Sequence, residues 1–202
     1  MRDHPVNQAR HKAGHLPASN IWLWGQGRPT VLDSFESRHG LRGSVITGVD
    51  IIRGLGLGMG MKLIAVPGAT GYIDTNFAGK GEAAVKAIAD NDVVIVHVEA
   101  ADEAGHLGDA AEKVKALERI DELILGPLLE ALRPLPAWRV LVAPDHPTPV
   151  STKAHSAVPP LYAYAGSDVK GGSGRRFTED EATATGVFLD PATKLMDEFL
   201  VR

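Results

Sequence analysis

The chain has 202 residues, a length that suits one domain with a core large enough to fold without disulfides or structural metals. Its 21 Lys and Arg against 25 Asp and Glu give a formal net charge of −4, which argues against a nucleic-acid-binding surface. It has no Cys, which excludes thiol chemistry and Cys-bound zinc and suits a cytoplasmic location, and no apolar run approaches the ~18 residues of a membrane span.

Short apolar runs alternate with longer segments of helical period along the chain, a pattern that favours an α/β domain with a largely parallel sheet. The predicted strands cover residues 21–24, 44–47, 62–66, 92–98, 139–143 and 161–165. Predicted helices cover residues 48–58, 80–89 and 110–132, followed by a short one after Thr178 and a last one from Pro191 to Phe199. We expect Pro127 to bend the helix over 110–132 or to split it.

Two segments rich in Asp and His follow predicted strands, and ligands bind beyond such strand ends in open α/β sheets. Asp102 and His106 come after the strand at 92–98, while Asp145, His146 and His155 come after the strand at 139–143. Asp and His ligate zinc, manganese and iron. Adjacent residues on an extended strand point to opposite sides, so Asp145 and His146 suit two ions about 4 Å apart better than one.

Plainer interpretations stay open for each segment. Asp102 and His106 are also typical of a solvated loop or helix cap, and Asp145 and His146 of a simple turn. His97 is interpreted as a packed strand residue.

The Gly-rich stretch at 67–80 is a candidate phosphate cradle through its backbone amides and Lys80, although its glycines also suit plain turns. It lacks the residue order of a P-loop, so it does not support nucleotide binding.

Five segments together resemble one family, the archaeal-type cofactor-independent phosphoglycerate mutases of the alkaline phosphatase superfamily. They are residues 18–27, 67–72, 74–76 with Lys80, 97–106 and 145–149. The resemblance runs from about His4 to the C-terminus and implies a three-layer α/β/α sandwich with a largely parallel sheet. It also implies an isomerase of glycolysis that interconverts 3- and 2-phosphoglycerate through a phosphoserine intermediate.

The same resemblance assigns roles to particular residues. It implies two divalent ions, manganese, zinc or magnesium, one held by Asp102, His106 and His155 and the other by Asp145 and His146. Lys80 matches a family lysine that contacts the transferring phosphoryl group, which makes it a substrate-binding residue.

The family's Ser nucleophile, a further Asp ligand and a smaller inserted domain come from an N-terminal half that these residues do not match. Ser151 and Ser156 flank His155, but neither follows a strand as the family's nucleophile does. We therefore expect a core incomplete at its N-terminus, formed by residues 20–202, with residues 1–19 returning from the inserted domain. We then expect the nucleophile to be absent from this chain, so that the chain alone is inactive and needs the other half in cis or in trans. The oligomeric state of the protein is left open.

Three alternatives remain at this point. The same core serves related phosphotransferases, such as a kinase acting on homoserine. A truncated chain that keeps the fold would act as a non-catalytic metal-binding module. An unrelated α/β protein could carry similar loops by coincidence.

Overall fold

The computed structural model describes residues 1–23, 25–171 and 174–200, and the chain divides into two compact units, Met1–Val31 and Leu32–Arg202. In the first unit, helix α1 (Pro5–Lys12) carries the buried Asn7, whose side-chain amide bonds to the backbone of Met1 and Ala18. The strand predicted at 21–24 is wrong for residues 21–23, which are exposed coil, because no described segment of this unit pairs with them; Trp24 lies outside the described residues.

The second unit contains a parallel sheet with the strand order β2-β1-β3. Its strands are β1 (Gly43–Ile46), β2 (Lys62–Leu63) and β3 (Val93–Val96), and Val45 of β1 lies opposite both Leu63 and Ile95. A separate antiparallel pair joins β4 (Arg139–Val142) to β5 (Ala163–Gly166). The prediction of an α/β fold is thus confirmed, although the strand expected at 62–66 is only two residues long.

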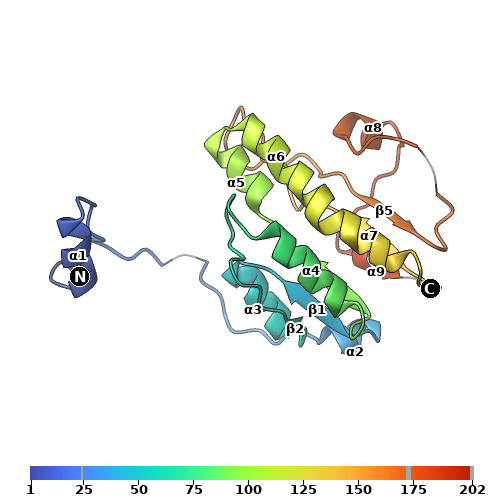
Figure 1. The fold of residues 1–202 in the computed structure, drawn as a ribbon, viewed down its shortest axis with the longest axis horizontal. Helices are drawn as coiled ribbons and strands as arrows, with labels where there is room; N and C mark the ends of the chain where they lie inside the picture. The colour runs from blue at the N-terminus through green and yellow to red at the C-terminus, as the bar shows by residue number, and fades with distance from the viewer. Residues whose placement is uncertain (24, 172–173, 201–202) are drawn as a thin grey trace. The chain divides into compact units, whose positions relative to one another are not determined.

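The helices of this unit agree broadly with the predicted ones. They are α2 (Phe35–His39), α3 (Asp50–Gly58), α4 (Phe77–Ala87), α5 (Ala100–Leu107), α6 (Ala110–Ile120), the π-helical turn η1 (Asp121–Leu125), α7 (Gly126–Leu132), α8 (Glu179–Thr183) and α9 (Lys194–Leu200). Figure 1 shows α6 and α7 as one long rod that lies beside α4. None of the described helices has the length and apolar character of a membrane span.

Side chains on the two faces of the parallel sheet belong to two separate hydrophobic cores, because successive side chains along a strand point to opposite faces. Val45 and Ile95 pack with Phe35 of α2, Ile52 of α3 and residues of α9. On the other face, Val96 packs against a cluster formed by Phe77, Ala100, Ala116 and Ile124. Helices therefore cover both faces, which gives three layers.

Pro127 interrupts the long helix, as expected. It has no N–H to donate to the carbonyl of Leu123, and the chain adapts through η1, in which the N–H of Gly126 bonds to the carbonyl of Asp121 five residues back. The carbonyl of Leu123 instead faces Gly81 of α4, so closely that a Cβ at position 81 would overlap it. Glycine at 81 thus allows α4 to lie directly against the π turn.

Candidate metal centre

Helix α5 places Asp102 and His106 one turn apart on the same face, where Asp102 Oδ2 and His106 Nε2 are 3.2 Å apart. The sequence suggested loops for these residues, but they lie on a regular helix that ends at Gly108 in the left-handed conformation. Small residues allow this helix to pack closely against the segment that contains Thr148. Ala104 is fully buried, and a Cβ on Gly105 would come within 2.5 Å of the carbonyl oxygen of Thr148.

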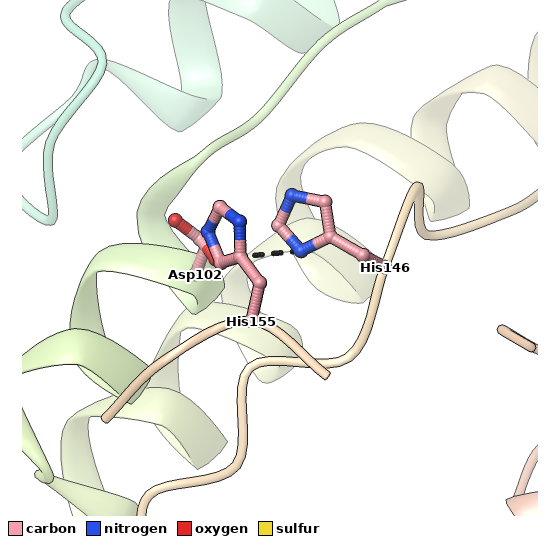
Figure 2. A group of neighbouring side chains, drawn as sticks. All are labelled: Asp102, His146 and His155. Carbon is pink, nitrogen blue, oxygen red and sulfur yellow. Dashed lines mark ion pairs between the residues drawn. The ribbon is translucent and has the colours of Figure 1, made fainter. Parts of the chain in front are cut away.

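The segment after β4 supplies the remaining candidate ligands and returns to α5. His155 Nε2 lies 3.4 Å from Asp102 Oδ1 and 3.0 Å from His106 Nε2. The ring centroids of His146 and His155 are 3.7 Å apart, and His146 Nδ1 is 3.9 Å from Asp102 Oδ1. Figure 2 shows His146 and His155 side by side, with Asp102 facing them from α5.

Asp145 completes the group from its solvent-exposed side. Its Oδ2 lies 3.3 Å from His146 Nε2, and three quarters of its side chain is accessible. The expectation that Asp145 and His146 point to opposite sides is wrong, because β4 ends at Val142 and the chain bends at both residues instead of staying extended. We call Asp102, His106, Asp145, His146 and His155 the His–Asp cluster.

One hydrogen bond fixes the tautomer of His106. Its Nδ1 lies 3.0 Å from the carbonyl oxygen of Lys153, which can only accept, so Nδ1 carries a proton, and in the neutral ring the lone pair is on Nε2, which faces the cluster. The same bond raises the pKa of His106, with a further contribution from the Asp102 carboxylate. An outer bond of this kind is typical of metal-binding histidines.

Thr148 links Asp102 on α5 to the segment that carries His146, and it was not predicted as a site residue. Its hydroxyl, almost fully buried, donates a short hydrogen bond to Asp102 Oδ1, and its carbonyl accepts one of 2.7 Å from Lys113. Thr148 lies within the Asp-His-Pro-Thr-Pro segment, so the only available signal was its proximity to Asp145 and His146.

Lys80 is completely buried beneath the end of β3. Its Nζ donates to the carbonyl of His97 at 3.0 Å and contacts that of Thr70 at 3.5 Å. Burial lowers the pKa of Lys80, and the nearby Glu99 carboxylate opposes that shift. Lys80 therefore joins the Gly-rich loop to the strand end from which α5 departs.

Glu99 and His97 connect Lys80 electrostatically to the cluster. Burial raises the pKa of Glu99, and so do the neighbouring carboxylates of Glu103, Asp102 and Asp145. Burial also lowers the pKa of His97, whose Nδ1 lies 3.2 Å from the Thr47 hydroxyl. Glu99 was not predicted as a site residue, although it stands in the same segment as Asp102.

The donor set suits a divalent cation. Asp102, His146 and His155 offer one ligand atom each, all within 4.8 Å of one another, and Glu99, Asp102 and Glu103 form a second such group. Imidazole nitrogens with carboxylate oxygens are the ligands that zinc and manganese take.

Comparison with known proteins places these residues in context. The "Metalloenzyme superfamily" model matches residues 2–202. The 2,3-bisphosphoglycerate-independent phosphoglycerate mutase of Methanothrix thermoacetophila is 47% identical over 187 residues, which are 92% of this chain and 48% of that protein. A probable enzyme of the same name from Geobacter sulfurreducens is 39% identical over 203 residues, 100% of this chain and 51% of that protein.

Solved structures agree with the predicted architecture. A protein from Pyrococcus horikoshii matches with a TM-score of 0.78 at 29% identity and covers 91% of this chain and 48% of its own. The cofactor-independent phosphoglycerate mutase of Thermoplasma acidophilum matches in fold, with a TM-score of 0.58 at 22% identity over 99% of this chain and 47% of its own. The alkaline-phosphatase-like α/β fold is thereby confirmed, and the chain spans about half the length of the curated relatives it matches.

Proposed function

The chain belongs to the metalloenzyme superfamily, and from this premise we propose that it is the C-terminal, metal-binding part of a 2,3-bisphosphoglycerate-independent phosphoglycerate mutase. The convergence of Asp102, His106 and His155 on one point, with His106 oriented by Lys153, is the observation that supports the proposal most directly. The substrate proposed for the whole protein is phosphoglycerate. The proposal includes a cytoplasmic location, which the cysteine-free composition suits.

We propose that the cluster holds two divalent ions, manganese, zinc or magnesium. Asp102, His106 and His155 would hold one, and Asp145 and His146 the other, with the exposed Asp145 on the solvent side. Such ions neutralise charge on a phosphoryl group and fix its oxygens in place. Asp102 contacts histidines of both sets, at 3.2 Å from His106 and 3.9 Å from His146.

Lys80 is the proposed substrate-binding residue. Its ammonium has three donors, and the contacts with His97 and Thr70 account for two of them. These contacts hold the charge beneath the Gly-rich loop and within electrostatic reach of Glu99, which itself interacts with Asp102 and Asp145. In this position Lys80 would offset the negative charge that a phosphate adds to the site.

The nucleophile is proposed to come from the rest of the protein, so the isolated chain should bind metal without mutase activity. The test is to assay interconversion of 3- and 2-phosphoglycerate with the chain alone and with the chain co-expressed with the unmatched half of the Methanothrix relative. We expect activity only in the second sample, and only with a divalent metal. Ordinary enzyme turnover by the isolated chain would overturn the proposal.

A parallel assay with ATP and homoserine separates the mutase from a kinase built on the same core. The curated relatives described above carry the mutase name, so we expect turnover of phosphoglycerate and none of homoserine. Phosphorylation of homoserine by the same complex would replace the mutase assignment.

A further inference from the structure

Thr148 lies where the two proposed ligand sets meet. Its hydroxyl bonds to Asp102 Oδ1 and lies 3.3 Å from Nδ1 of His146, so one oxygen contacts a ligand of each proposed ion. The residue is only 3% exposed, which leaves solvent little access to that oxygen. Thr152 in the same segment differs, because its side chain is exposed and its hydroxyl contacts only nearby backbone carbonyls.

The backbone around Thr148 is held by residues outside the His–Asp cluster. Nζ of Lys113, on α6, donates to its carbonyl at 2.7 Å, and a Cβ on Gly105 of α5 would come within 2.5 Å of the same oxygen. One residue earlier, the carbonyl of Pro147 accepts a hydrogen bond of 2.9 Å from the amide of Ser156. The hydroxyl of Thr148 is thus placed by contacts that do not themselves require a metal.

The number of hydrogens available assigns the tautomer of His146. A hydroxyl has one hydrogen to donate, and Thr148 donates it to Asp102, whose carboxylate can only accept. In its contact with His146 the hydroxyl is therefore the acceptor, so Nδ1 of His146 carries a hydrogen. In the neutral ring the lone pair is then on Nε2, which lies 3.3 Å from Asp145 Oδ2.

With both rings neutral, lone pairs face carboxylate oxygens at two places in the cluster. Nε2 of His146 faces Asp145, and Nε2 of His106, whose Nδ1 is held by a backbone carbonyl, lies 3.2 Å from Asp102 Oδ2. Two acceptors in contact repel each other unless a proton or a cation lies between them. The partner of His106 belongs to the main chain, whereas the partner of His146 is a side chain that substitution can remove.

We propose that Thr148 is a positioning residue of the His–Asp cluster, whose hydroxyl turns Asp102 and His146 toward their two ions. This inference rests on the proposed function, because the two ions and their ligand sets are those proposed there. The hydroxyl fixes the Asp102 carboxylate by donation and the His146 ring by acceptance, so its removal disturbs one ligand in each set at once. Metal-binding histidines typically hold their second ring nitrogen in this way.

The first test is the tautomer of His146 in the metal-free chain. Ring-nitrogen chemical shifts from NMR, recorded at about pH 9 where imidazoles are neutral, distinguish a hydrogen on Nδ1 from one on Nε2. We expect it on Nδ1 in the parent. In Thr148→Val it should move toward Nε2, because valine has a similar shape without the acceptor and Asp145 can then accept from Nε2. A hydrogen on Nε2 in the parent would overturn the inference, whatever the variant does.

Metal affinity, measured by titration with manganese or zinc, is the second readout. Thr148→Val should weaken binding by at least about tenfold, as the loss of an outer partner of a ligand does. Thr148→Ser keeps the hydroxyl and should retain the tautomer and affinity of the parent. Thr152→Val removes the exposed hydroxyl of the same segment and is the matched control, so it too should bind as the parent does. An unchanged tautomer or affinity in Thr148→Val, or an equal loss in either other variant, would overturn the inference.

Neither readout depends on catalysis, which separates this inference from the proposed function. The function is tested by mutase turnover of the chain co-expressed with the unmatched half of the Methanothrix relative. No turnover, with His146 in the expected tautomer and metal affinity lost in Thr148→Val, would overturn the mutase assignment alone. Turnover by a complex whose metal-free chain carries the hydrogen on Nε2 of His146 would overturn the positioning role alone.

Discussion

Asp102 is the residue that all three histidines of the His–Asp cluster contact. It lies 3.2 Å from His106 and 3.4 Å from His155, and it accepts a hydrogen bond from Thr148. Only a fifth of its side chain is accessible, so its carboxylate needs compensating positive charge. The histidines around this carboxylate, together with a bound cation, would supply that charge.

The first prediction concerns metal affinity. His106→Ala and His155→Ala should each weaken manganese or zinc binding by at least about tenfold, since the loss of an outer-shell partner alone costs 10- to 100-fold. Bound metal is measured by titration calorimetry and by elemental analysis of the purified chain. The control is His11→Ala, on the exposed surface of α1, which should bind as the parent does. Unchanged affinity in both cluster variants would remove them from the proposed site.

A second prediction concerns acid stability and the pair Arg139 and Asp168. Hydrogen bonds from Arg139 lower the pKa of Asp168, so folding is favoured by the charged carboxylate. This contribution is complete above the ordinary Asp pKa of about 3.9 and is lost as the pH falls through the lowered value. Asp168→Asn should thus unfold at a lower urea concentration than the parent at pH 7, with the difference shrinking in acid. A difference that stays constant from pH 7 to pH 2 would contradict this linkage.

At the scale of elements, the contact between α4 and η1 depends on the absence of a side chain. Pro127 frees the carbonyl of Leu123, and Gly81 leaves room for it. A proline in one helix and a glycine in another are therefore two parts of one packing arrangement.

Replacement of Gly81 by alanine, with Gly54 as the control position, gives a third prediction. Gly81→Ala should lower the free energy of unfolding by about 1–3 kcal/mol, since the added methyl meets backbone that cannot rotate away. Gly54→Ala in α3 is the matched control. Nothing lies within 4 Å of a Cβ at Gly54, and alanine should stabilise that helix by about 0.5–1 kcal/mol. Urea denaturation measures both; equal effects of the two substitutions would show that the contact at Gly81 is unimportant.

Much of the element pattern was predictable from the sequence because the strands near 44, 93 and 140 are short runs rich in Val and Ile. The run at 21–24 is also continuously apolar, but a strand requires a neighbour, which composition does not reveal. Asp102 and His106 were predicted together, yet their helix was not, because Ala100 and Ala104 form it through packing. Thr148 and Lys153 act through side-chain and backbone contacts across 46 and 47 residues of sequence, which no local pattern encodes.

At the scale of the whole molecule, the two units differ in what holds them together. The first is organised by one buried asparagine, while the second is built around a sheet with a core on each face. All five cluster residues lie in the second unit, so ligand binding should be reflected in its stability.

Metal should therefore stabilise the fold, which is the fourth prediction. Binding to the native state alone contributes about 2.7 kcal/mol at a metal concentration 100-fold above the dissociation constant. For a chain of this size the midpoint of thermal unfolding should rise by roughly 5–10 °C when manganese or zinc is added, and EDTA should reverse the rise. Calorimetry or circular dichroism measures the shift. The double variant Asp102→Asn/His155→Ala should show none, and an equal shift in that variant would locate the effect elsewhere.

The cluster takes all its side chains from one continuous stretch, Asp102 to His155. A cation shared by His106 and His155, as proposed, would join residues 49 apart in sequence and so would close a loop in the way a disulfide does. The entropic cost of such closure rises only with the logarithm of loop length, and it is the same whatever chain lies outside the loop. The loop from His106 to His155 stays intact if the chain termini are moved to any position outside it, or if the other half is attached at either end. The proposed site is thus independent of the order in which the rest of the polypeptide is connected.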